Sequence, residues 1–194
     1  MSARRQRQMC IRDSTSGEHE PAPDTDSGDG PQSQPGQASG HTYTEKVHTG
    51  PLASKGTGDS HEFSMNDVDQ GNLGDCGVHA ALAAVAKANP KHLKSLIKDN
   101  GNGTFDVKLH IDVDGDALPW AVDTVVTVDA KLPTRADGRP AYAGDSGTGD
   151  NGELWVMLFE KAIAAAAGGY SKIVGQYDGG AVSYTHLTLP TSTH

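Results

Sequence analysis

The sequence has 194 residues, of which 35% are hydrophobic, and its formal net charge at pH 7 is −9. This length is sufficient for one domain with a hydrophobic core, and the acidic balance argues against a nucleic-acid partner. The chain contains neither an apolar run of membrane-spanning length nor the apolar core of a signal peptide, so we expect no membrane partner. Two cysteines do not form a disulfide framework, which favours a reducing, cytoplasmic location.

The two ends of the chain are related to each other through their coding sequence. One choice of codons for residues 4–14 has a reverse complement that translates as AVSYTHLTLPT, which is the sequence of residues 181–191. The shared string also resembles a transposon adapter used in sequencing libraries. We therefore expect residues 1–14 and 181–194 to be translated adapter rather than protein, and the natural reading frame to continue past Gly180.

Residues 15–60 are rich in Gly, Ser, Pro, Asp and Thr and contain almost no large apolar residue. Such a segment cannot bury enough surface to offset the entropy lost on ordering it, so we predict a disordered acidic leader. A linker or a regulatory tail is the alternative. The globular core is expected over residues 61–180.

Two helices are predicted at the start of this core. Apolar residues recur at helical spacing after Asp75, and the pair Asn89-Pro90 suits the end of one helix and the first turn of the next. The second helix is predicted to stop near Gly101. The apolar positions are Val78, Leu82 and Val85 in the first helix and Leu93, Leu96 and Ile97 in the second.

Strand-like segments follow the two helices. The segment TFDVKLHID, which starts at Thr104, alternates apolar and polar residues. The pair Asp114-Gly115 is typical of a turn, and DTVVTVDAKLP, which starts at Asp123, is a second run rich in β-branched residues. These patterns predict two strands joined by a turn.

The last predicted element is a helix from Glu153 to about Ala167. Its apolar residues form a stripe along one side, and Gly168-Gly169 is a typical helix end. Helices mixed with short strands predict the α+β class.

Cys76 lies at the predicted start of the first helix, in the segment QGNLGDCGVHAALAAVA (residues 70–86). Unpaired N–H groups at a helix N-terminus favour a thiolate, and Gly71 and Gly74 permit a sharp turn and a close approach of a substrate. The side-chain amide of Gln70 could hydrogen-bond an oxyanion together with the backbone N–H of Cys76. On these residues alone, a nucleophile and a buried structural cysteine both remain open.

The same segment resembles the active-site segment of the calpain family of papain-like cysteine proteases, in which Gln-Gly-x-x-Gly-Asp-Cys precedes an apolar, alanine-rich helix. Three further blocks resemble the family in the same order: LIKDNGNGTFDVKL, VTVDAKLPT and GELWVMLFEKAIAAAAGGYSKIVG. The resemblance runs from about Asn66 to Gly175. It implies a papain-like fold of calpain type, truncated to the first, Cys-bearing and mainly helical lobe.

The resemblance also assigns roles to individual residues. Cys76 matches the nucleophile, and Gln70 matches the amide of the oxyanion hole. Asp67 and Glu153 match calcium ligands of animal calpains, and their hard carboxylate oxygens suit Ca²⁺. The alternative is a solvated carboxylate at each position. The family's general-base His and the Asn that orients it would lie after Gly180.

Two residues of the predicted active-site helix depart from the family pattern. Gly77 stands where the family usually has a bulky aromatic residue, and a glycine in the first helical turn costs roughly 0.5–1 kcal/mol relative to Ala. Either the cleft is remodelled or the protein has departed from catalysis. His79 stands at an apolar family position, three residues after Cys76. We favour a surface or partly buried histidine there over a Cys–His pair.

Other candidate sites have a simpler interpretation. The segment DVDGDALPWAVD (Asp112–Asp123) has aspartates at alternate positions, but it lacks the sixth-position Gly and the twelfth-position Glu of a calcium loop, so we predict a hairpin turn. His92 is predicted to face solvent, and His110 to lie on the polar side of a strand. Trp120 and Trp155 are predicted to be core residues.

The sequence therefore predicts a calpain-like cysteine endopeptidase of the calcium-dependent type, which would hydrolyse peptide bonds in a protein or peptide substrate. The chain as given is expected to be inactive alone, because the matching general base would lie outside it. Two alternatives stay open. One is a non-catalytic calpain-like module that binds protein or calcium, which Gly77 favours. The other is a redox or acyl-transfer thiol at Cys76.

Overall fold

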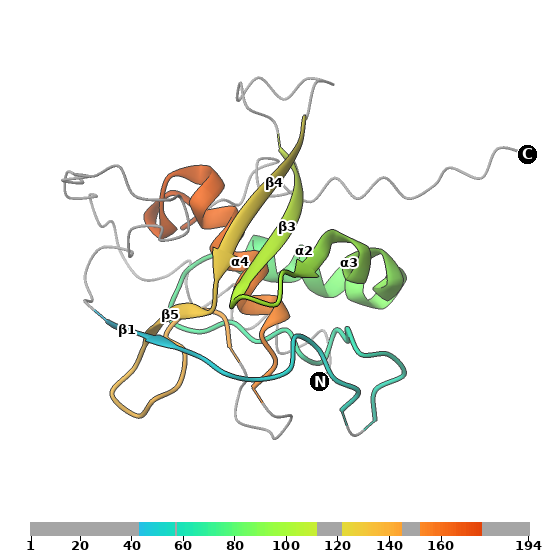
Figure 1. Cartoon of the computed structure of the whole chain (residues 1–194), viewed down its shortest axis with the longest axis horizontal. Helices are drawn as coiled ribbons and strands as arrows, with labels where there is room; N and C mark the ends of the chain where they lie inside the picture. Colours follow the sequence, from blue (N-terminus) through green and yellow to red (C-terminus); the bar gives the residue numbers. More distant parts are fainter. Residues whose placement is uncertain (1–42, 57, 112–121, 145–151, 176–194) are drawn as a thin grey trace, which may run out of the picture.

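The computed structural model describes residues 43–56, 58–111, 122–144 and 152–175 (Figure 1). Helices and strands are mixed within these ranges, which confirms the predicted α+β class. None of the helices in these ranges is long and apolar enough to cross a lipid bilayer. In chain order the elements are β1 (Thr44–Val47), α2 (Cys76–Ala88), α3 (Pro90–Leu96), β2 (Ile97–Asp99), β3 (Thr104–Ile111), β4 (Val122–Asp129), β5 (Lys131–Thr134), α4 (Trp155–Ala167) and the short 3₁₀ helix η1 (Tyr170–Lys172).

Several predicted features lie outside the described residues. They are the two adapter-like ends, the leader up to residue 42, the turn at Asp114-Gly115 with most of the surrounding Asp112–Asp123 segment, Trp120, and residues 145–151 of the long Gly/Asp loop.

The helices α2 and α3 lie where the sequence predicts two consecutive helices. Asn89 follows α2, and its side chain accepts a hydrogen bond of 3.2 Å from the backbone N–H of His92, which caps α3. Pro90 occupies the first turn of α3, where its missing N–H costs no hydrogen bond. α3 is shorter than predicted, because at Ile97 the chain becomes extended and pairs with Val107 as strand β2. Strand pairing that buries Ile97 overrides the local helix propensity here.

The strands β2, β3 and β4 form an antiparallel sheet. β3 and β4 pair along their whole length, from Thr104 opposite Asp129 to Ile111 opposite Val122. Alternate residues of both strands are buried, which confirms the period-two pattern predicted for β3. The buried residues on this face are Phe105, Val107, Leu109, Val126 and Val128.

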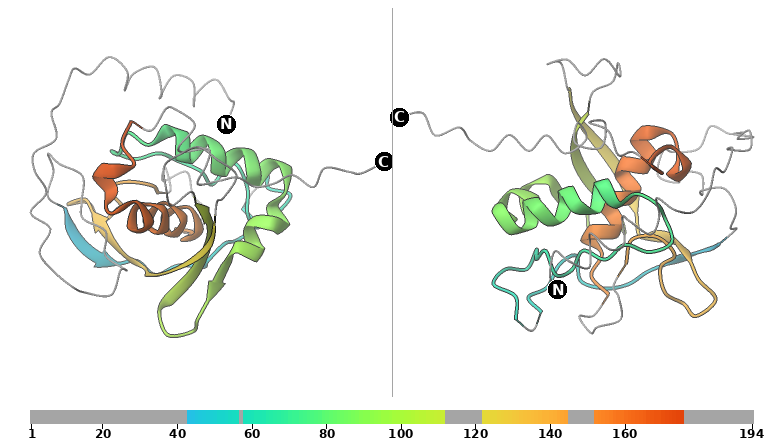
Figure 2. Two further views of the ribbon diagram at one scale, coloured as in Figure 1. Left: turned by 90° about the horizontal axis from the view of Figure 1, so that it is seen from above. Right: turned by 180° about the vertical axis from the view of Figure 1, so that it is seen from behind.

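The helix α4 is the central element of the described chain. It lies between α2 and the β3–β4 ribbon (Figure 2), and every residue from Trp155 to Ala164 is buried. A helix that is buried all round is typical of a protein core. It begins at Trp155 rather than at the predicted Glu153. It ends at Gly168, whose φ of 89° lies in the left-handed region that favours glycine.

The described part of the chain begins with a strand that the sequence does not predict. β1 pairs antiparallel with β5, with Thr44 opposite Thr134 and Val47 opposite Lys131. The segment 15–60, predicted to be disordered, therefore contains a strand, β1. The physical reason is that the backbone of a polar segment can pair with another strand without burying large side chains of its own.

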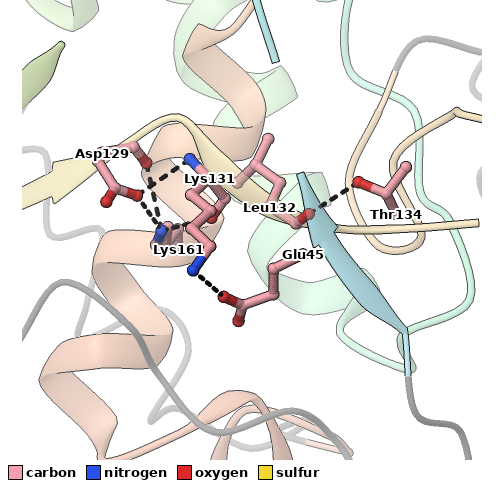
Figure 3. Close-up of polar contacts among 6 residues, drawn as sticks. All are labelled: Glu45, Asp129, Lys131, Leu132, Thr134 and Lys161. Carbon is pink, nitrogen blue, oxygen red and sulfur yellow. Dashed lines mark hydrogen bonds and ion pairs between the residues drawn. The ribbon is translucent and has the colours of Figure 1, made fainter. Parts of the chain in front are cut away.

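Lys161 ties α4 to the corner between β4 and β5 (Figure 3). Its side chain is 1% exposed, and its Nζ donates to Asp129 Oδ1 at 2.7 Å, to the Asp129 carbonyl at 3.3 Å and to the Lys131 carbonyl at 2.6 Å. Burial lowers the pKa of Lys161, and the Asp129 carboxylate opposes that shift. A buried ammonium group is tolerated only where such partners replace its water shell. Lys161 is therefore an anchor between the core helix and both sheets.

The variant Lys161→Met should lower the free energy of unfolding by about 1–3 kcal/mol, because it leaves the Asp129 carboxylate and the Lys131 carbonyl without their buried donor. Urea unfolding followed by circular dichroism measures this change. Lys87→Met, at an exposed position of α2, is the matched control and should change the value by less than about 0.5 kcal/mol. An equal effect in the two variants would contradict the anchoring role.

Candidate active site

Cys76 is the first residue of α2, where the sequence predicts a helix to begin. Its thiol is free, and the residue is only 6% exposed. The N-cap residue Asp75 makes no side-chain hydrogen bond to the first turn, although Asp is among the residues that most often cap helices in this way. The N–H groups at this end of α2 therefore have no carboxylate cap, and they would stabilise an anion beside Cys76.

The loop before Cys76 packs closely against another part of the chain. A Cβ at Gly71 would lie 1.7 Å from the carbonyl oxygen of Tyr142, so a larger residue would displace the loop. The backbone N–H of Asn72 donates to the carbonyl of Ala141 at 2.8 Å. These contacts set the path by which the chain enters α2, and they explain why the turn needs glycine.

The side-chain amide of Gln70 lies in this loop and donates to the backbone carbonyl of Leu73. We expected this amide to be available for an oxyanion beside an accessible Cys76. In the described arrangement the amide is engaged within the loop and the cysteine is nearly covered. A substrate carbonyl would reach both groups only after a local rearrangement in which Gln70 gives up or shares its bond with Leu73.

Asp67 and Glu153, the two predicted calcium ligands, lie together in the structure. Asp67 Oδ2 accepts hydrogen bonds from the Ser64 backbone N–H at 2.7 Å and from Trp155 Nε1 at 3.0 Å. Glu153 Oε1 accepts hydrogen bonds from the backbone N–H of Ser54, at 3.0 Å, and from the Ser54 hydroxyl. Glu153 Oε2 is buried and accepts no hydrogen bond from the described residues. When Glu153 is protonated, its carboxyl group also hydrogen-bonds Asp67.

The negative charge of this pair is poorly compensated. Burial raises the pKa of Glu153 to about 7; the charge of Asp67 adds to this shift, and the hydrogen bonds from Ser54 oppose it. Burial also raises the pKa of Asp67, with a smaller contribution from the charge of Asp59. No Lys or Arg of the described ranges forms an ion pair with Asp67 or Glu153. Adjacent carboxyl groups without a cationic partner are a donor set that suits a hard divalent cation.

A second cluster of buried polar groups adjoins Cys76 in the sequence, and we did not predict it. Asp75, His79 and Glu160 are 2%, 3% and 2% exposed, and one ligand atom from each lies within 4.8 Å of the others. His79 Nδ1 is 3.2 Å from Asp75 Oδ1, and both Glu160 oxygens accept the Ala143 backbone N–H, at 3.1 and 3.0 Å. The prediction of a surface or partly buried His79 is therefore wrong. The four-residue spacing of Asp75 and His79 was the one local signal for their contact.

The other described residues that the sequence singled out show no further site in the structure. His92 is half-buried rather than solvent-facing. The Nδ1 atom of His110 contacts Asp123 Oδ1 at 2.8 Å on the exposed side of the sheet, and Trp155 is fully buried, as predicted for a core residue. Gly77 is partly exposed in the first turn of α2.

Comparison with known proteins gives the family of this chain. A family model described as calpain family cysteine protease matches residues 56–188. The chain belongs to the calpain family. Similar proteins include the calpain-type cysteine proteases DEK1 of Zea mays and of Arabidopsis thaliana, each 30% identical over 119 residues, and ADL1 of Oryza sativa subsp. japonica, 31% identical over 117 residues. Each match covers 60% of this calpain-family chain and 5% of the relative.

The matched range includes Cys76 and Gln70 together with Asp67 and Glu153. It starts before residue 61 and ends after residue 180, so it crosses both boundaries that the sequence predicts for the core. Those boundaries stay predictions. The resemblance of the active-site segment to calpains is confirmed at the level of the family.

The raised pKa of Glu153 predicts a dependence of stability on pH in this calpain-family chain. Between its ordinary value of 4.5 and about 7, folded Glu153 keeps a proton that the unfolded chain loses, so the free energy of unfolding should fall as pH rises through this window. Glu153→Gln should make this fall shallower. Urea midpoints at pH 5 and pH 7.5, in the presence of a chelator, measure the effect.

The control for this prediction is Glu62→Gln, the same chemical change at an exposed carboxyl that pairs with Lys94. It should leave the fall in stability unchanged. Some pH dependence should persist in Glu153→Gln, because burial also raises the pKa of Glu160 well above its usual value. Identical pH profiles for the wild type and Glu153→Gln would contradict the assignment.

Proposed function

We propose that this chain carries the nucleophile-bearing lobe of a papain-like, calpain-type cysteine endopeptidase, with Cys76 as the nucleophile and Gln70 as an oxyanion donor. The observation that carries the proposal is the position of Cys76 as the first residue of α2, within the range that matches the calpain family. The positive end of a helix lowers the free energy of a thiolate, and no Asp75 carboxylate caps this end. A nucleophilic role uses these features, whereas a structural cysteine would need neither.

In the proposed reaction, the thiolate of Cys76 attacks the carbonyl carbon of a peptide bond and forms a C–S bond. The backbone N–H of Cys76 and the amide of Gln70 would hold the oxyanion. A general base takes the thiol proton. The C–N bond then breaks, the amine leaves with that proton from the protonated base, and water hydrolyses the thioester. By the resemblance, the base is a His, oriented by an Asn, on a second lobe encoded beyond Gly180. We therefore expect no peptidase activity from this chain alone.

The described loop must open before a substrate can bind. Cys76 is nearly covered, and Gln70 is held by the Leu73 carbonyl. Gly77 has no side chain, so it leaves room beside the sulfur where the family usually has an aromatic residue. We propose that local movement of the Gln70–Asp75 loop gives a protein or peptide substrate access to the thiol, and that a reducing, cytoplasmic compartment keeps that thiol free.

Alkylation of the native chain tests the role of Cys76. Because Cys10 is the other cysteine, the experiment uses a Cys10→Ser background, in which iodoacetamide at pH 7 can modify only Cys76. We expect labelling of the folded chain, measured by intact mass, and no labelling once Cys76→Ala is added. The same chain in urea gives the rate for a fully accessible thiol. Labelling in urea but not in the folded chain would mean a sealed structural cysteine and would overturn the proposal.

The Asp67–Glu153 pair supports calcium as the second part of the proposed function. Asp67 and Glu153 would hold the ion through carboxylate oxygens, and Glu153 Oε2, which accepts no hydrogen bond from the described residues, fits such a role. The ion would neutralise Asp67 and Glu153, the second of which has its pKa raised by burial and by the charge of Asp67. Asp67 precedes the Gln70 loop in the chain and receives a hydrogen bond from the α4 residue Trp155. Calcium would therefore stabilise the junction between this loop and the start of α4.

Calcium addition should raise the unfolding temperature of the wild-type chain at pH 7.5, because the ion binds only the folded pair of carboxylates. Glu153→Gln and Asp67→Asn should each abolish this increase, whereas Glu62→Gln should retain it. Differential scanning fluorimetry with Ca²⁺ and with Mg²⁺ as the comparison ion measures the response. An equal response in Glu153→Gln would mean that calcium binds elsewhere.

A non-catalytic calpain-like module is the second candidate function. The burial of Cys76, the engaged amide of Gln70 and the unusual Gly77 favour it. Such a module would keep the calcium response of Asp67 and Glu153 but would show no alkylation of folded Cys76. The two experiments above therefore separate the candidates.

A further inference from the structure

The cluster of Asp75, His79 and Glu160 lies between α2 and α4, away from solvent. The three residues come from two helices and the N-cap position, and each is at least nine-tenths buried. One ligand atom from each lies within 4.8 Å of the others. We propose that these three residues bind a divalent first-row transition-metal ion of the Zn²⁺ class, separate from the Asp67–Glu153 pair.

The first argument is that several polar atoms of the cluster have no hydrogen-bond partner. Both carboxylate oxygens of Asp75 and the Nε2 atom of His79 are buried and form no hydrogen bond with the described residues. The approach of His79 Nδ1 to Asp75 Oδ1, at 3.2 Å, is an ion-pair distance without hydrogen-bond geometry. Leaving such atoms without partners costs free energy. A coordinated cation would satisfy a carboxylate oxygen and a ring nitrogen together.

The second argument is the balance of charge in the site. With both carboxylates ionised and the imidazole neutral, the cluster carries a charge of −2. A divalent ion would neutralise that charge at a position that is buried from solvent. Lys161, the next residue after Glu160, is already engaged by Asp129 and by the Lys131 carbonyl. No ion pair within the described ranges joins a Lys or Arg to Asp75 or Glu160.

The third argument is the type of donor. Imidazole nitrogen with carboxylate oxygen suits zinc and its neighbours, whereas Ca²⁺ and Mg²⁺ prefer oxygen alone. Ligand atoms within 4.8 Å of each other need only small side-chain movements to converge on an ion with bonds of about 2.0–2.2 Å. The buried hydroxyl of Tyr170 also has no hydrogen-bond partner among the described residues. Burial, with a smaller contribution from the charge of Glu160, raises its pKa, so this hydroxyl stays protonated and is not counted among the three ligands.

Protons are the rival occupants of this cluster. Burial raises the pKa of Glu160 well above its usual value, and the charge of Asp75 adds to the shift. Burial opposes a charge on His79, but the charge of Asp75 contributes most to raising its pKa overall. Glu160 with a proton beside an Asp75–His79 ion pair would also be neutral. In that arrangement the protonated Glu160 donates to Asp75, but His79 Nε2 is still buried without a hydrogen bond, and a metal ion would supply its partner.

Metal analysis and titration of the full 194-residue chain test the proposal. The chain is produced in zinc-supplemented medium, and its metal content is measured by mass spectrometry. After removal of metal with a chelator, it is titrated with Zn²⁺ and with Co²⁺, whose visible spectrum reports the ligand field. We expect one tightly held ion per chain, a rise in unfolding temperature with Zn²⁺, and proton release as Glu160 gives up its proton.

Variants distinguish this site from other metal-binding groups. His79→Leu, which places an apolar residue at this position, and Glu160→Gln should lose the bound zinc and the thermal response. His61→Leu, the same change at an exposed histidine, should retain both. Cys76→Ala should also retain both, and the Co²⁺ spectrum should show no thiolate ligand. Glu153→Gln should lose the calcium response and keep the zinc response, so failure of the calcium proposal and failure of this one are distinguishable.

Two results would overturn the metal site. One is a wild-type chain that retains no zinc and shows no thermal shift with it, which would mean that protons fill the cluster. The other is zinc binding by His79→Leu that equals that of the wild type. Circular dichroism shows whether His79→Leu is folded. If that variant does not fold, the wild-type metal content and the Co²⁺ spectrum still decide between metal and protons.

Discussion

Two ionisable side chains on consecutive residues of a buried helix are the constraint on which the rest of this structure depends. Glu160 and Lys161 lie in α4 and are 2% and 1% exposed. Lys161 reaches Asp129 and the corner between β4 and β5, whereas Glu160 accepts the Ala143 N–H and lies beside the start of α2. A charge inside a protein must find partners. Lys161 therefore needs the β4–β5 corner beside it, and Glu160 needs Ala143 and the start of α2.

The start of α4 also positions the Asp67–Glu153 pair. Trp155, its first residue, donates from its indole to Asp67, and Glu153, just before it, accepts from Ser54. The segment from β1 to the loop at Gln70 is thus attached to α4 at two points. This explains why a polar segment with few large apolar residues has a defined path: its ordering entropy is offset by buried hydrogen bonds to the core helix together with the packing of Phe63 on Trp155.

The sequence was sufficient where neighbouring residues decide the structure. The period of apolar residues and the Asn89-Pro90 pair located α2 and α3, and glycine located the end of α4. Sequence reasoning failed at Ile97 and at β1, because strand pairing depends on partners far away in the chain. Cys76 was placed correctly at a helix start, but its burial was not predictable from a local pattern. His79 and Glu160 meet only because α4 packs on α2, and an alanine-rich helix pattern contains no signal for that contact.

Asp75 lies beside both Cys76 and the buried cluster, and its single carboxyl group cannot cap α2 and face His79 at the same time. If it capped α2, it would place a negative charge against the N–H groups beside Cys76 and disfavour a thiolate there. It instead turns toward His79 and Glu160 and leaves the positive end of α2 uncapped. Whatever neutralises the buried cluster, a proton or a metal ion, therefore also decides how much negative charge remains one residue away from the sulfur. The charge beside Cys76 is therefore set from inside the core as well as by the end of α2.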